Sequence, residues 1–506
     1  MSPPHPRPIK SICIVGGGSA GWMTAAFLSK MLGQACAITL IESEEIGTIG
    51  VGEATIPAIK TFNGLLELDE VEFIRRTQGS FKLGIEFRDW GHTGNSYIHG
   101  FGRIGQDWGW LRLHQYWRRA LSLGETPGDI GRYSINVQAA RANRFMPPRT
   151  DSKTSPLADI AYAYHFDAGL YARYLREQAQ TRGVSRIEGH ITGVDLRAAD
   201  GFIESVTLRS GQVVGAELFI DCSGMRSLLL GEALKVPFED WSHWLPCDRA
   251  LAVPSESVSP LTPYTRSTAH SAGWQWRIPL QHRIGNGHVY ASAFIDDEAA
   301  ADTLLRHLDS PPTAEPRAIR FRTGRRRTLW EKNCVAIGLS GGFLEPLEST
   351  SLHLIQSGLI RLLSLFPDSA FRPADIALYN HQSVIEYAHV RDFIIAHYKL
   401  NRRDDSDFWR TCREMSIPDS LQRRLDIFAS AGRVMPEVAD ELFSAESWIM
   451  VLLGQGLLPA AWDPAAELKT PEETLRFLAN VEAVVRKCVA VMPDHAEFIA
   501  RTCAAQ

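Results

Sequence analysis

The sequence lacks the segments that place a protein in a membrane or direct it for secretion. None of its apolar runs approaches the roughly 20 residues that a membrane-spanning helix needs. The opening stretch, MSPPHPRPIK, carries prolines and basic residues but no hydrophobic segment, which a secretory signal requires. We therefore expect a cytoplasmic protein with no membrane partner.

The chain also lacks an excess of basic charge and any regular spacing of metal ligands. Its 53 Lys and Arg residues face 58 Asp and Glu residues, and the net charge of −5 at pH 7 disfavours a nucleic-acid partner. The eight cysteines are scattered without a CxxC pair, and the 16 histidines show no HxxxH spacing. This pattern is typical of reduced core cysteines, so we predict neither a disulfide framework nor a metal site.

What the sequence does contain is a dinucleotide-binding turn close to its start. An apolar strand runs into the motif Gly16-x-Gly18-x-x-Gly21, a helix is expected over 20–32, and a second apolar run, 37–41, ends at Glu42. Glycines at this spacing allow a tight turn and a close approach of the backbone to a pyrophosphate, which the helix N-terminus stabilises. An acid about twenty residues further on can hold a ribose hydroxyl. We therefore expect a bound dinucleotide.

The nucleotide-binding unit is distributed over three blocks of sequence, around 10–90, 160–230 and 320–365, with the segments between them as insertions. A helix over 166–182 is expected to lead into strands over 187–196, 202–208 and 213–220. Small polar residues follow two strands, at 221–224 and at 338, where the backbone can approach a ligand closely.

The insertions and the C-terminal part have different patterns. We expect an amphipathic helix over 108–123, which carries Trp110 and Trp117, and a strand-rich region over 241–294. Beyond residue 366 the periodicity is helical. The helices are expected at 373–400, 418–431, 447–453 and 471–491.

Two segments in the first block carry residues suited to chemistry. The stretch GVGEATIP, 50–57, has glycines that let a chain lie against a flat ring system. The stretch SFKLGIEF, 80–87, places Lys82 inside an apolar strand-like run. Lys82 is either an edge lysine that reaches water, or a desolvated amine whose pKa is lowered so that it becomes available for chemistry.

Two later segments add to this set. GWQWRIP, 273–279, places Trp274 and Trp276 on one side of a strand, where they are either core residues or part of a cofactor wall. GFLEPLESTS, 342–351, lies directly before an expected helix. Its Ser349 and Thr350 are residue types that cap the start of a helix, and Glu345 or Glu348 can complement the helix dipole. Alternatively, the free backbone N–H groups at the start of this helix can bind an anion.

Together these segments resemble one family, the flavin-dependent halogenases of the tryptophan-halogenase type. GGGSAGWM, IGVGEATIP, the lysine in SFKLGIEF, WQWRIP and FLEPLEST occur in that family's order and spacing. The match covers about three quarters of the chain. WxWxIP and PLEST are the most discriminating parts, because ordinary flavin monooxygenases lack them.

The resemblance implies a fold and a division of the chain. The fold is α/β, with an FAD-binding Rossmann-like core of the GxGxxG flavin monooxygenase type, an inserted β-rich segment and a mainly helical C-terminal substrate region. Residues 1–365 are expected to form the FAD-binding module, with substrate-side insertions at about 91–160 and 231–320. Residues 366–506 are expected to form the helical substrate-binding region.

The resemblance also implies a mechanism and its residues. A separate NAD(P)H-dependent flavin reductase supplies diffusible FADH2, and O2 and chloride or bromide give hypohalous acid (HOX) at the flavin. Lys82 either forms a haloamine or polarises HOX, and Glu348 either polarises HOX or removes the ring proton. The halide is expected at Thr350 and Ser351, and a small aromatic substrate at His99, Phe101, Glu348, Ser349 and Trp448, although Trp448 equally fits a core tryptophan. Contacts with FAD are expected from Gly16, Gly18, Ser19, Ala20, Gly21, Glu42, Gly50, Val51, Gly52, Glu53, Ala54, Asp221, Gly224 and Gly338.

Two departures from the family pattern concern the substrate. Halogenases of free tryptophan usually follow PLEST with glycine, but this chain has Ser351. Those enzymes also carry a paired tyrosine in their C-terminal region, whereas no tyrosine follows Tyr398 here. Because recognition of charged groups needs buried partners, we expect free indole or an indole derivative as the substrate. A tryptophan halogenase proper and a flavin monooxygenase without halogenation are the alternatives, and the sequence leaves open whether the chain forms a homodimer.

Overall fold

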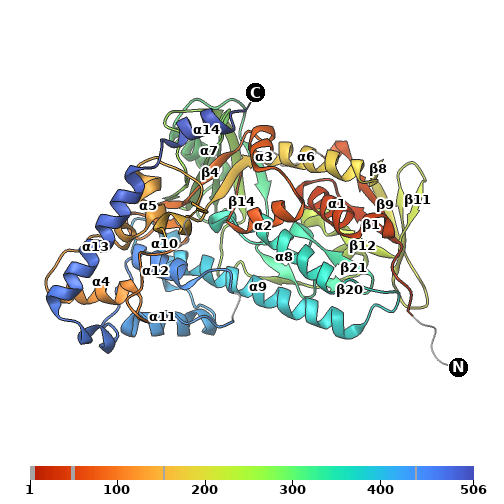
Figure 1. Ribbon diagram of the computed structural model, residues 1–506. Coiled ribbons are helices and arrows are strands. Elements are labelled where there is room, and N and C mark those ends of the chain that lie inside the picture. The colour runs from red at the N-terminus through yellow and green to blue at the C-terminus, as the bar shows by residue number, and fades with distance from the viewer. Residues whose placement is uncertain (1–5, 47–51, 152–153, 439–440, 506) are drawn as a thin grey trace.

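The computed structural model describes residues 6–46, 52–151, 154–438 and 441–505 of the chain. Its dinucleotide-binding part is a six-stranded sheet in the order β20-β21-β12-β1-β2-β8, parallel except for the β20 edge. α1 and α6 pack against each other beside this sheet, in the right half of Figure 1. The elements are β1 Ser11–Val15, α1 Ser19–Leu32, β2 Ala37–Glu42, α6 Ala168–Thr181, β8 Ser185–Glu188, β12 Leu218–Asp221, β20 Trp330–Glu331 and β21 Cys334–Ala336.

This arrangement follows from the local sequence. All residues of β1 except Ser11 are buried, as a parallel strand covered on both faces requires. Parallel neighbours need a crossover, and α1 supplies it between β1 and β2. The turn between β1 and α1 therefore lies at the carboxyl end of the sheet, where open α/β sheets bind their ligands.

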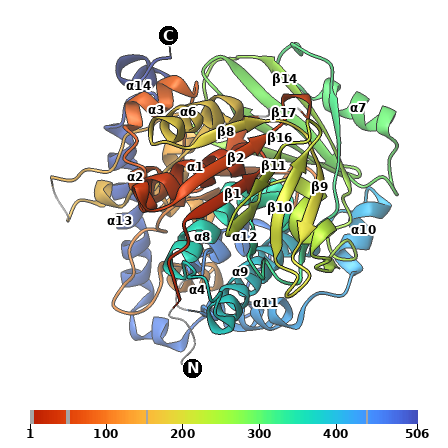
Figure 2. The same ribbon diagram turned by 90° about the vertical axis from the view of Figure 1, so that its right-hand side faces the viewer.

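A second sheet has seven strands in the order β18-β14-β17-β16-β15-β5-β6. Every residue of β16, which carries the two tryptophans, is buried. The sheet stands behind the nucleotide-binding sheet in Figure 2. Its strands are β5 Gly84–Arg88, β6 Ser96–Gly100, β14 Arg249–Glu256, β15 Thr265–His270, β16 Gly273–Pro279, β17 Arg283–Tyr290 and β18 Arg317–Arg320.

A small sheet joins the lysine segment to the glycine-rich loop. β7, Ala163–Asp167, lies between β3, Gly52–Ala54, and β4, Ser80–Lys82, and pairs with both. Two segments almost thirty residues apart in the chain are thereby held in one layer. The other short strands are β9 Ile191–Leu196, β10 Ile203–Leu208, β11 Val213–Gly215, β13 Phe238–Asp240, β19 Gly324–Arg326 and β22 Gly342–Phe343.

The rest of the described chain is largely helical. α9 packs against α8 and β20 and also against α10, α11 and α12, and so connects the nucleotide-binding sheet with the helices in the left half of Figure 1. The helices are α2 Ala58–Leu65, α3 Glu70–Arg76, α4 Leu113–Ser122, α5 Ile135–Arg141, α7 Asp297–Arg306, α8 Ser351–Ser364, α9 Pro373–Lys399, α10 Asp407–Glu414, α11 Asp419–Ala431, α12 Ala445–Gly454, α13 Pro471–Ala490 and α14 His495–Thr502.

Four local predictions need correction. The helix expected over 108–123 begins only at Leu113, because Gly109 has a positive φ and Arg112 is extended. The strand expected over 187–196 is two strands, β8 and β9, and the strand expected over 213–220 is also two, β11 and β12; the two strands of each pair belong to different sheets. Lys82 and the residues after it likewise divide between β4 and β5 of different sheets.

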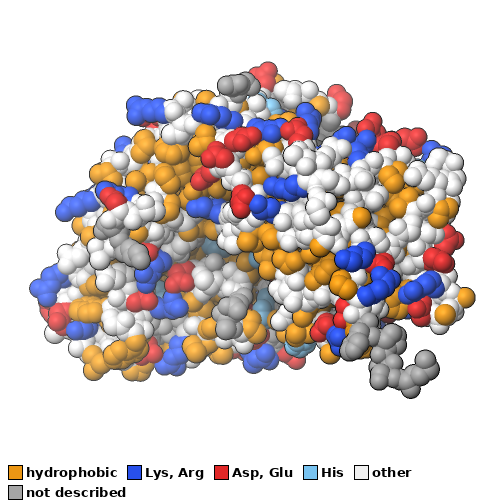
Figure 3. Space-filling model, turned by 45° about the vertical axis from the view of Figure 1, so that its right-hand side comes forward, with side chains coloured by type: hydrophobic (Ala, Val, Ile, Leu, Met, Phe, Trp, Pro, Cys, Tyr) orange, Lys and Arg blue, Asp and Glu red, His pale blue; other side chains and the backbone are white. Residues whose placement is uncertain are grey.

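The α/β fold with a parallel sheet and a helical C-terminal region is as predicted. Among the described residues, no helix combines the length and the apolar character that a membrane crossing demands. Acidic and basic side chains alternate over the face shown in Figure 3, as expected when the two signs are nearly balanced.

Candidate active site

The first glycine turn has no room for side chains on one side and faces open space on the other. A Cβ atom at Gly16, whose φ is +113°, would overlap the carbonyl oxygen of Cys222, and one at Gly17 would overlap the carboxylate of Glu42. A Cβ at Gly18, by contrast, would meet nothing within 4 Å. The backbone therefore packs tightly against the sheet and presents Gly18 to a cavity.

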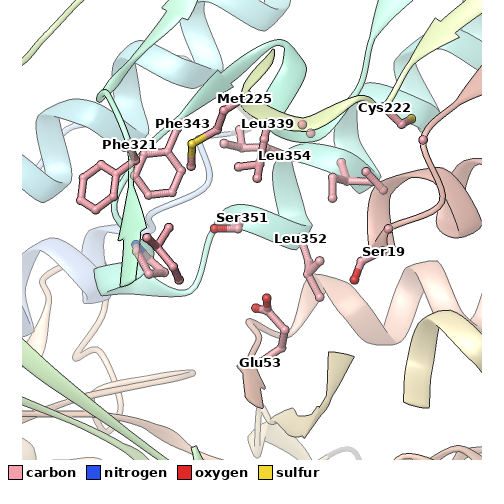
Figure 4. Close-up of a pocket in the computed structure, with 18 of the residues that line it drawn as sticks. Ser19, Glu53, Cys222, Met225, Phe321, Leu339, Phe343, Ser351, Leu352 and Leu354 are labelled. Atoms are coloured by element: carbon pink, nitrogen blue, oxygen red, sulfur yellow. The ribbon is translucent and has the colours of Figure 1, made fainter. Parts of the chain in front are cut away.

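That cavity has a volume of about 750 Å³ and is lined by all three nucleotide-binding blocks. In Figure 4, Ser19 lies at one end, Phe321 and Phe343 at the other, and Ser351 between them, with the Glu53 carboxylate below. A cradle of glycine backbone, a helix N-terminus and an elongated apolar cavity fit the phosphates and the ring system of FAD. The predicted FAD contacts that line it are Gly16, Gly18, Ser19, Ala20, Glu42, Gly52, Glu53, Ala54, Gly224 and Gly338.

Of the other predicted FAD contacts, Gly50 and Val51 fall outside the described residues, and Gly21 and Asp221 do not line the cavity. Gly21 lies behind the lining, and its missing Cβ lets α1 approach the carbonyl oxygen of Gly16. Asp221 is buried, and its carboxylate accepts hydrogen bonds from the backbone N–H groups of Ser223, Leu229 and Leu230. Asp221 therefore shapes the loop that lines the cavity.

The segment 346–351 forms the boundary between this cavity and the predicted catalytic residues, Lys82 and Glu348. Pro346, Leu347, Ser349 and Ser351 line the cavity, whereas Glu348 is turned to the other side, toward two histidines. Ser349 permits this turn by adopting a left-handed conformation, with φ 60° and ψ 36°. Such a conformation is strained for a residue other than glycine, and strain of this kind is concentrated at functional sites.

Lys82 reaches this boundary from the side opposite the cavity. Its side chain is fully buried, and Nζ donates hydrogen bonds to the Thr55 carbonyl oxygen at 2.9 Å and to Ser349 Oγ at 2.8 Å. Burial lowers the pKa of Lys82 to about 7, and the Glu348 charge opposes this effect. Phe101 presents its ring 5.3 Å from Nζ. Lys82 is therefore a desolvated amine and not an edge lysine that reaches water, and it contacts the cavity wall through Ser349.

Glu348 is held by two imidazoles. His99 Nδ1 lies 2.9 Å from Oε2, and His397 Nε2 lies 2.8 Å from Oε1. Burial alone would raise the pKa of Glu348, but the interactions with these two histidines outweigh it and lower the pKa to about 2. A carboxylate only accepts hydrogen bonds, so both facing nitrogens must carry protons. Glu348 is thus an ionised group beside the Lys82 amine.

The predicted substrate residues only partly come together. His99, Phe101, Glu348 and Ser349 surround Lys82 and one another. Trp448 is buried behind Phe393 as seen from these residues, and the centroids of the two rings lie 4.7 Å apart. Phe393 in turn packs against the rings of His99 and His397. An aromatic layer therefore separates Trp448 from the Glu348 carboxylate.

The predicted halide residues lie at the first turn of α8. No side chain caps this turn, and the side chain of Ser351 lines the cavity. Thr350 is fully buried, and its hydroxyl oxygen has no hydrogen-bond partner among the residues that the structure describes. Free backbone N–H groups at a helix start together with an unused buried hydroxyl are suited to a small anion.

Sequence reasoning missed several residues of the site. His397 comes from the last turns of α9, Tyr97 donates to its Nδ1 at 3.2 Å, and Glu345 is engaged by Trp274 and Tyr398. One signal was available, because His397 interrupts the apolar run from Phe393 to Ala396. A buried histidine in such a run needs a polar partner.

Taken together, the glycine turn, the cavity at the carboxyl end of a parallel sheet and the adjoining amine and carboxylate define a flavin-dependent enzyme. The tryptophan halogenase family model matches residues 11–471 of the chain, and the protein belongs to that family as a flavin-dependent halogenase.

Similar proteins cover almost the whole length of the chain. Tryptophan 7-halogenase KtzQ from Kutzneria sp. (strain 744) is 37% identical over 533 aligned positions, covering 97% of this chain and 98% of the relative. The structure of Xcc4156, a flavin-dependent halogenase from Xanthomonas campestris, has a TM-score of 0.95 and 47% identity, with 99% of both chains covered. The structure of BrvH, a flavin-dependent halogenase from Brevundimonas sp. BAL3, has a TM-score of 0.93 and 46% identity, covering 97% of this chain and 99% of the other.

Proposed function

We propose that the protein uses FADH2, O2 and chloride or bromide to halogenate a carbon of an indole ring. The overall reaction is FADH2 + O2 + X⁻ + H⁺ + ArH → FAD + ArX + 2 H2O. The flavin, when bound, supplies two of the four electrons that reduce O2 to water, and the conversion of ArH and X⁻ into ArX supplies the other two. The observation that carries the proposal is the position of the buried Lys82 amine within electrostatic reach of the ionised Glu348, on the far side of the cavity wall.

Each residue of the chain has a distinct task in this proposal. The first turn of α8 holds the halide next to the cavity, with N–H groups that replace its water. Ser349 holds Lys82, which donates a hydrogen bond to the oxygen of HOX. Glu348 accepts the ring proton after the halogen has bonded to carbon, because a cationic ring intermediate needs a base. Phe101 and His99 border the ring.

The division of the chain follows from these tasks. We propose that residues 1–365 carry the flavin and that residues 366–506 cover the substrate side, to which α9 contributes His397. A separate NAD(P)H-dependent flavin reductase supplies FADH2 by diffusion.

The identity of the substrate rests on two opposing observations. The lack of any tyrosine after Tyr398 predicts free indole or an indole derivative rather than free tryptophan. The comparisons give that expectation no support and favour the alternative, because curated relatives such as KtzQ are named for tryptophan. Tryptophan and indole present the same ring to Phe101 and His99, so both are required in the first experiment.

The experiment supplies the protein with FAD, a flavin reductase, NADH and each halide, and analyses the products by mass spectrometry. We expect a halogenated product that appears only when halide is present. We also expect this product to be lost in Lys82→Ala and in Glu348→Gln, while both variants still bind FAD. An oxygenated product formed without halide would contradict the proposal and favour a monooxygenase. The ratio of kcat/KM for tryptophan and indole then identifies the preferred substrate.

A further inference from the structure

Glu345 is a second buried glutamate in the same segment, and its hydrogen-bond partners differ from those of Glu348. It is fully buried, and its Oε2 accepts hydrogen bonds from Trp274 Nε1 at 2.8 Å and from the Tyr398 hydroxyl at 2.6 Å. Its Oε1 is buried and has no hydrogen-bond partner in the described part of the chain. An acidic side chain in such surroundings is costly, so its presence calls for a reason beyond packing.

The two partners of Glu345 belong to the two sides of the site. Trp274, on β16, lines the flavin cavity. Tyr398 follows His397 at the end of α9, and His397 holds Glu348. Consecutive residues of one helix thus hold two glutamates that are three positions apart, one on the flavin side and one on the catalytic side.

The neighbouring Trp276 provides a comparison within the molecule. It also lines the cavity, but its Nε1 is buried and no described residue offers it a hydrogen bond. Trp274 is held by Glu345 and packs against Trp90, which in turn contacts Tyr398 and His397. Within the described residues, therefore, Trp274 and not Trp276 is linked by hydrogen bonds, through Glu345, to Tyr398 of α9.

We propose that Glu345 is a positioning residue that fixes the indole of Trp274 in the wall of the flavin cavity and, through Tyr398, keeps this wall aligned with Glu348. This inference rests on the proposed function, because alignment matters only if an oxidant made in the cavity is consumed beside Glu348. Without Glu345, FADH2 and O2 still react, but a larger share of the O2 leaves as H2O2, by FADH2 + O2 → FAD + H2O2, before HOX can form.

Glutamine is the informative conservative replacement. Burial raises the pKa of Glu345 to about 7, while the hydrogen bonds from Trp274 and Tyr398 oppose this shift. The protonated acid and glutamine have the same shape and charge, and a single carbonyl oxygen has two lone pairs for the two donors. Glu345→Gln therefore keeps both hydrogen bonds, Glu345→Leu removes both, and Tyr398→Phe removes only the bond to α9.

The test uses the full chain labelled with 5-fluorotryptophan, in which one of the 13 tryptophan resonances is assigned to Trp274 by its absence in Trp274→Phe. In Glu345→Leu the ¹⁹F resonance of Trp274 is expected to shift and broaden in the flavin-free protein. The yield of halogenated product per FADH2 is expected to fall about three- to tenfold, with H2O2 rising and the KM of the aromatic substrate unchanged. Glu345→Gln is expected to restore both signals, and Tyr398→Phe to have an intermediate effect.

An unchanged Trp274 resonance in Glu345→Leu, or a glutamine variant as impaired as the leucine variant, would overturn the inference. If the leucine variant does not fold, Tyr398→Phe carries the test, and a wild-type resonance with wild-type yield in that variant overturns it. If the wild-type protein gives no halogenated product, the proposed function fails, while the resonance and the H2O2 release still decide whether Glu345 positions Trp274.

Discussion

His397 and Glu348 are joined by a hydrogen bond of 2.8 Å between Nε2 and Oε1, and this bond fixes where the proton of His397 lies. Because the carboxylate accepts, Nε2 carries the hydrogen, and Nδ1 accepts from the Tyr97 hydroxyl at 3.2 Å. Burial lowers the pKa of His397 despite the opposing effect of Glu348, so the ring is neutral. The neutral imidazole keeps Glu348 ionised and oriented.

Replacing His397 by phenylalanine is expected to make halogenation sensitive to acid. Loss of one of the two donors raises the pKa of Glu348 from about 2, because the effect of burial is then less opposed. The active carboxylate becomes protonated as the pH falls through the new pKa, and an acid limb appears in the pH–rate profile. We expect a rate loss of roughly tenfold at neutral pH, measured by single-turnover halogenation. His397→Gln, which keeps an N–H donor, is the control; an equal loss there would show that the imidazole acts in another way.

Lys82 is expected to produce the alkaline limb of the same profile. Its pKa is lowered to about 7 by burial, so the ammonium form disappears as the pH rises through that value. Two N–H groups of the ammonium are taken by Thr55 and Ser349, and the third remains for HOX. Halogenation should therefore fall above about pH 7 while FADH2 oxidation continues. A rate that rises with pH would instead indicate the neutral amine and a haloamine.

Lys82→Met is expected to separate activity from stability. Halogenation should fall at least about a hundredfold, with H2O2 release retained, because the donor to HOX is gone. The lysine of the unfolded chain binds its proton at higher pH than the buried lysine does. The free energy of unfolding of the wild type therefore declines as the pH falls from about 10 to about 7, and this loss of stability is complete below pH 7. The difference in the free energy of unfolding, variant minus wild type, should therefore increase as the pH falls from about 10 to about 7. Chemical denaturation at several pH values measures it, and a difference that does not vary with pH would contradict the assignment of a buried amine.

The parts of the site that depend on local chemistry were predictable from sequence. Gly16, Gly18 and the strand–helix–strand order around them follow from turn sterics and short-range periodicity, and Lys82 stood out as a charge inside an apolar run. Both kinds of signal are complete within about thirty residues of chain.

The partners that arrive from other elements were not predictable. The last turns of α9 are buried at every position from Asp392 to Tyr398, so periodicity gives no face and does not show that His397 points to Glu348 and Tyr398 to Glu345. In the same way, the spacing of the apolar residues before α4 suggested helix at Trp110. Its side chain is 79% exposed, and Gly109 and Arg112 break the helix there.

Two glycine variants are expected to separate folding from flavin binding. Gly16→Ala places a methyl group against the carbonyl oxygen of Cys222 at a φ of +113°, and should destabilise the flavin-free protein by about 1–3 kcal/mol. Gly18→Ala meets no protein atom within 4 Å, and its φ of −73° is ordinary, so stability should be unchanged. Its methyl group nevertheless enters the space expected for the pyrophosphate, so FAD affinity should fall. Thermal melts of the flavin-free protein and FAD titrations separate the two effects, and equal stability losses would contradict this account of the turn.

The affinity for halide is expected to depend more on the hydroxyl of Thr350 than on the side chain of Ser351. Thr350→Val keeps the shape of a fully buried residue but removes a hydroxyl that has no partner within the described chain. We expect the halide concentration for half-maximal halogenation to rise about three- to tenfold, because one donor to the anion is lost. Ser351→Gly keeps the backbone N–H at the first position of α8 and should change it little. Steady-state rates over a range of chloride and bromide concentrations measure both variants, with the KM of the aromatic substrate as the control. If Ser351→Gly has the larger effect, the anion is bound by that hydroxyl and the backbone site proposed for it is wrong.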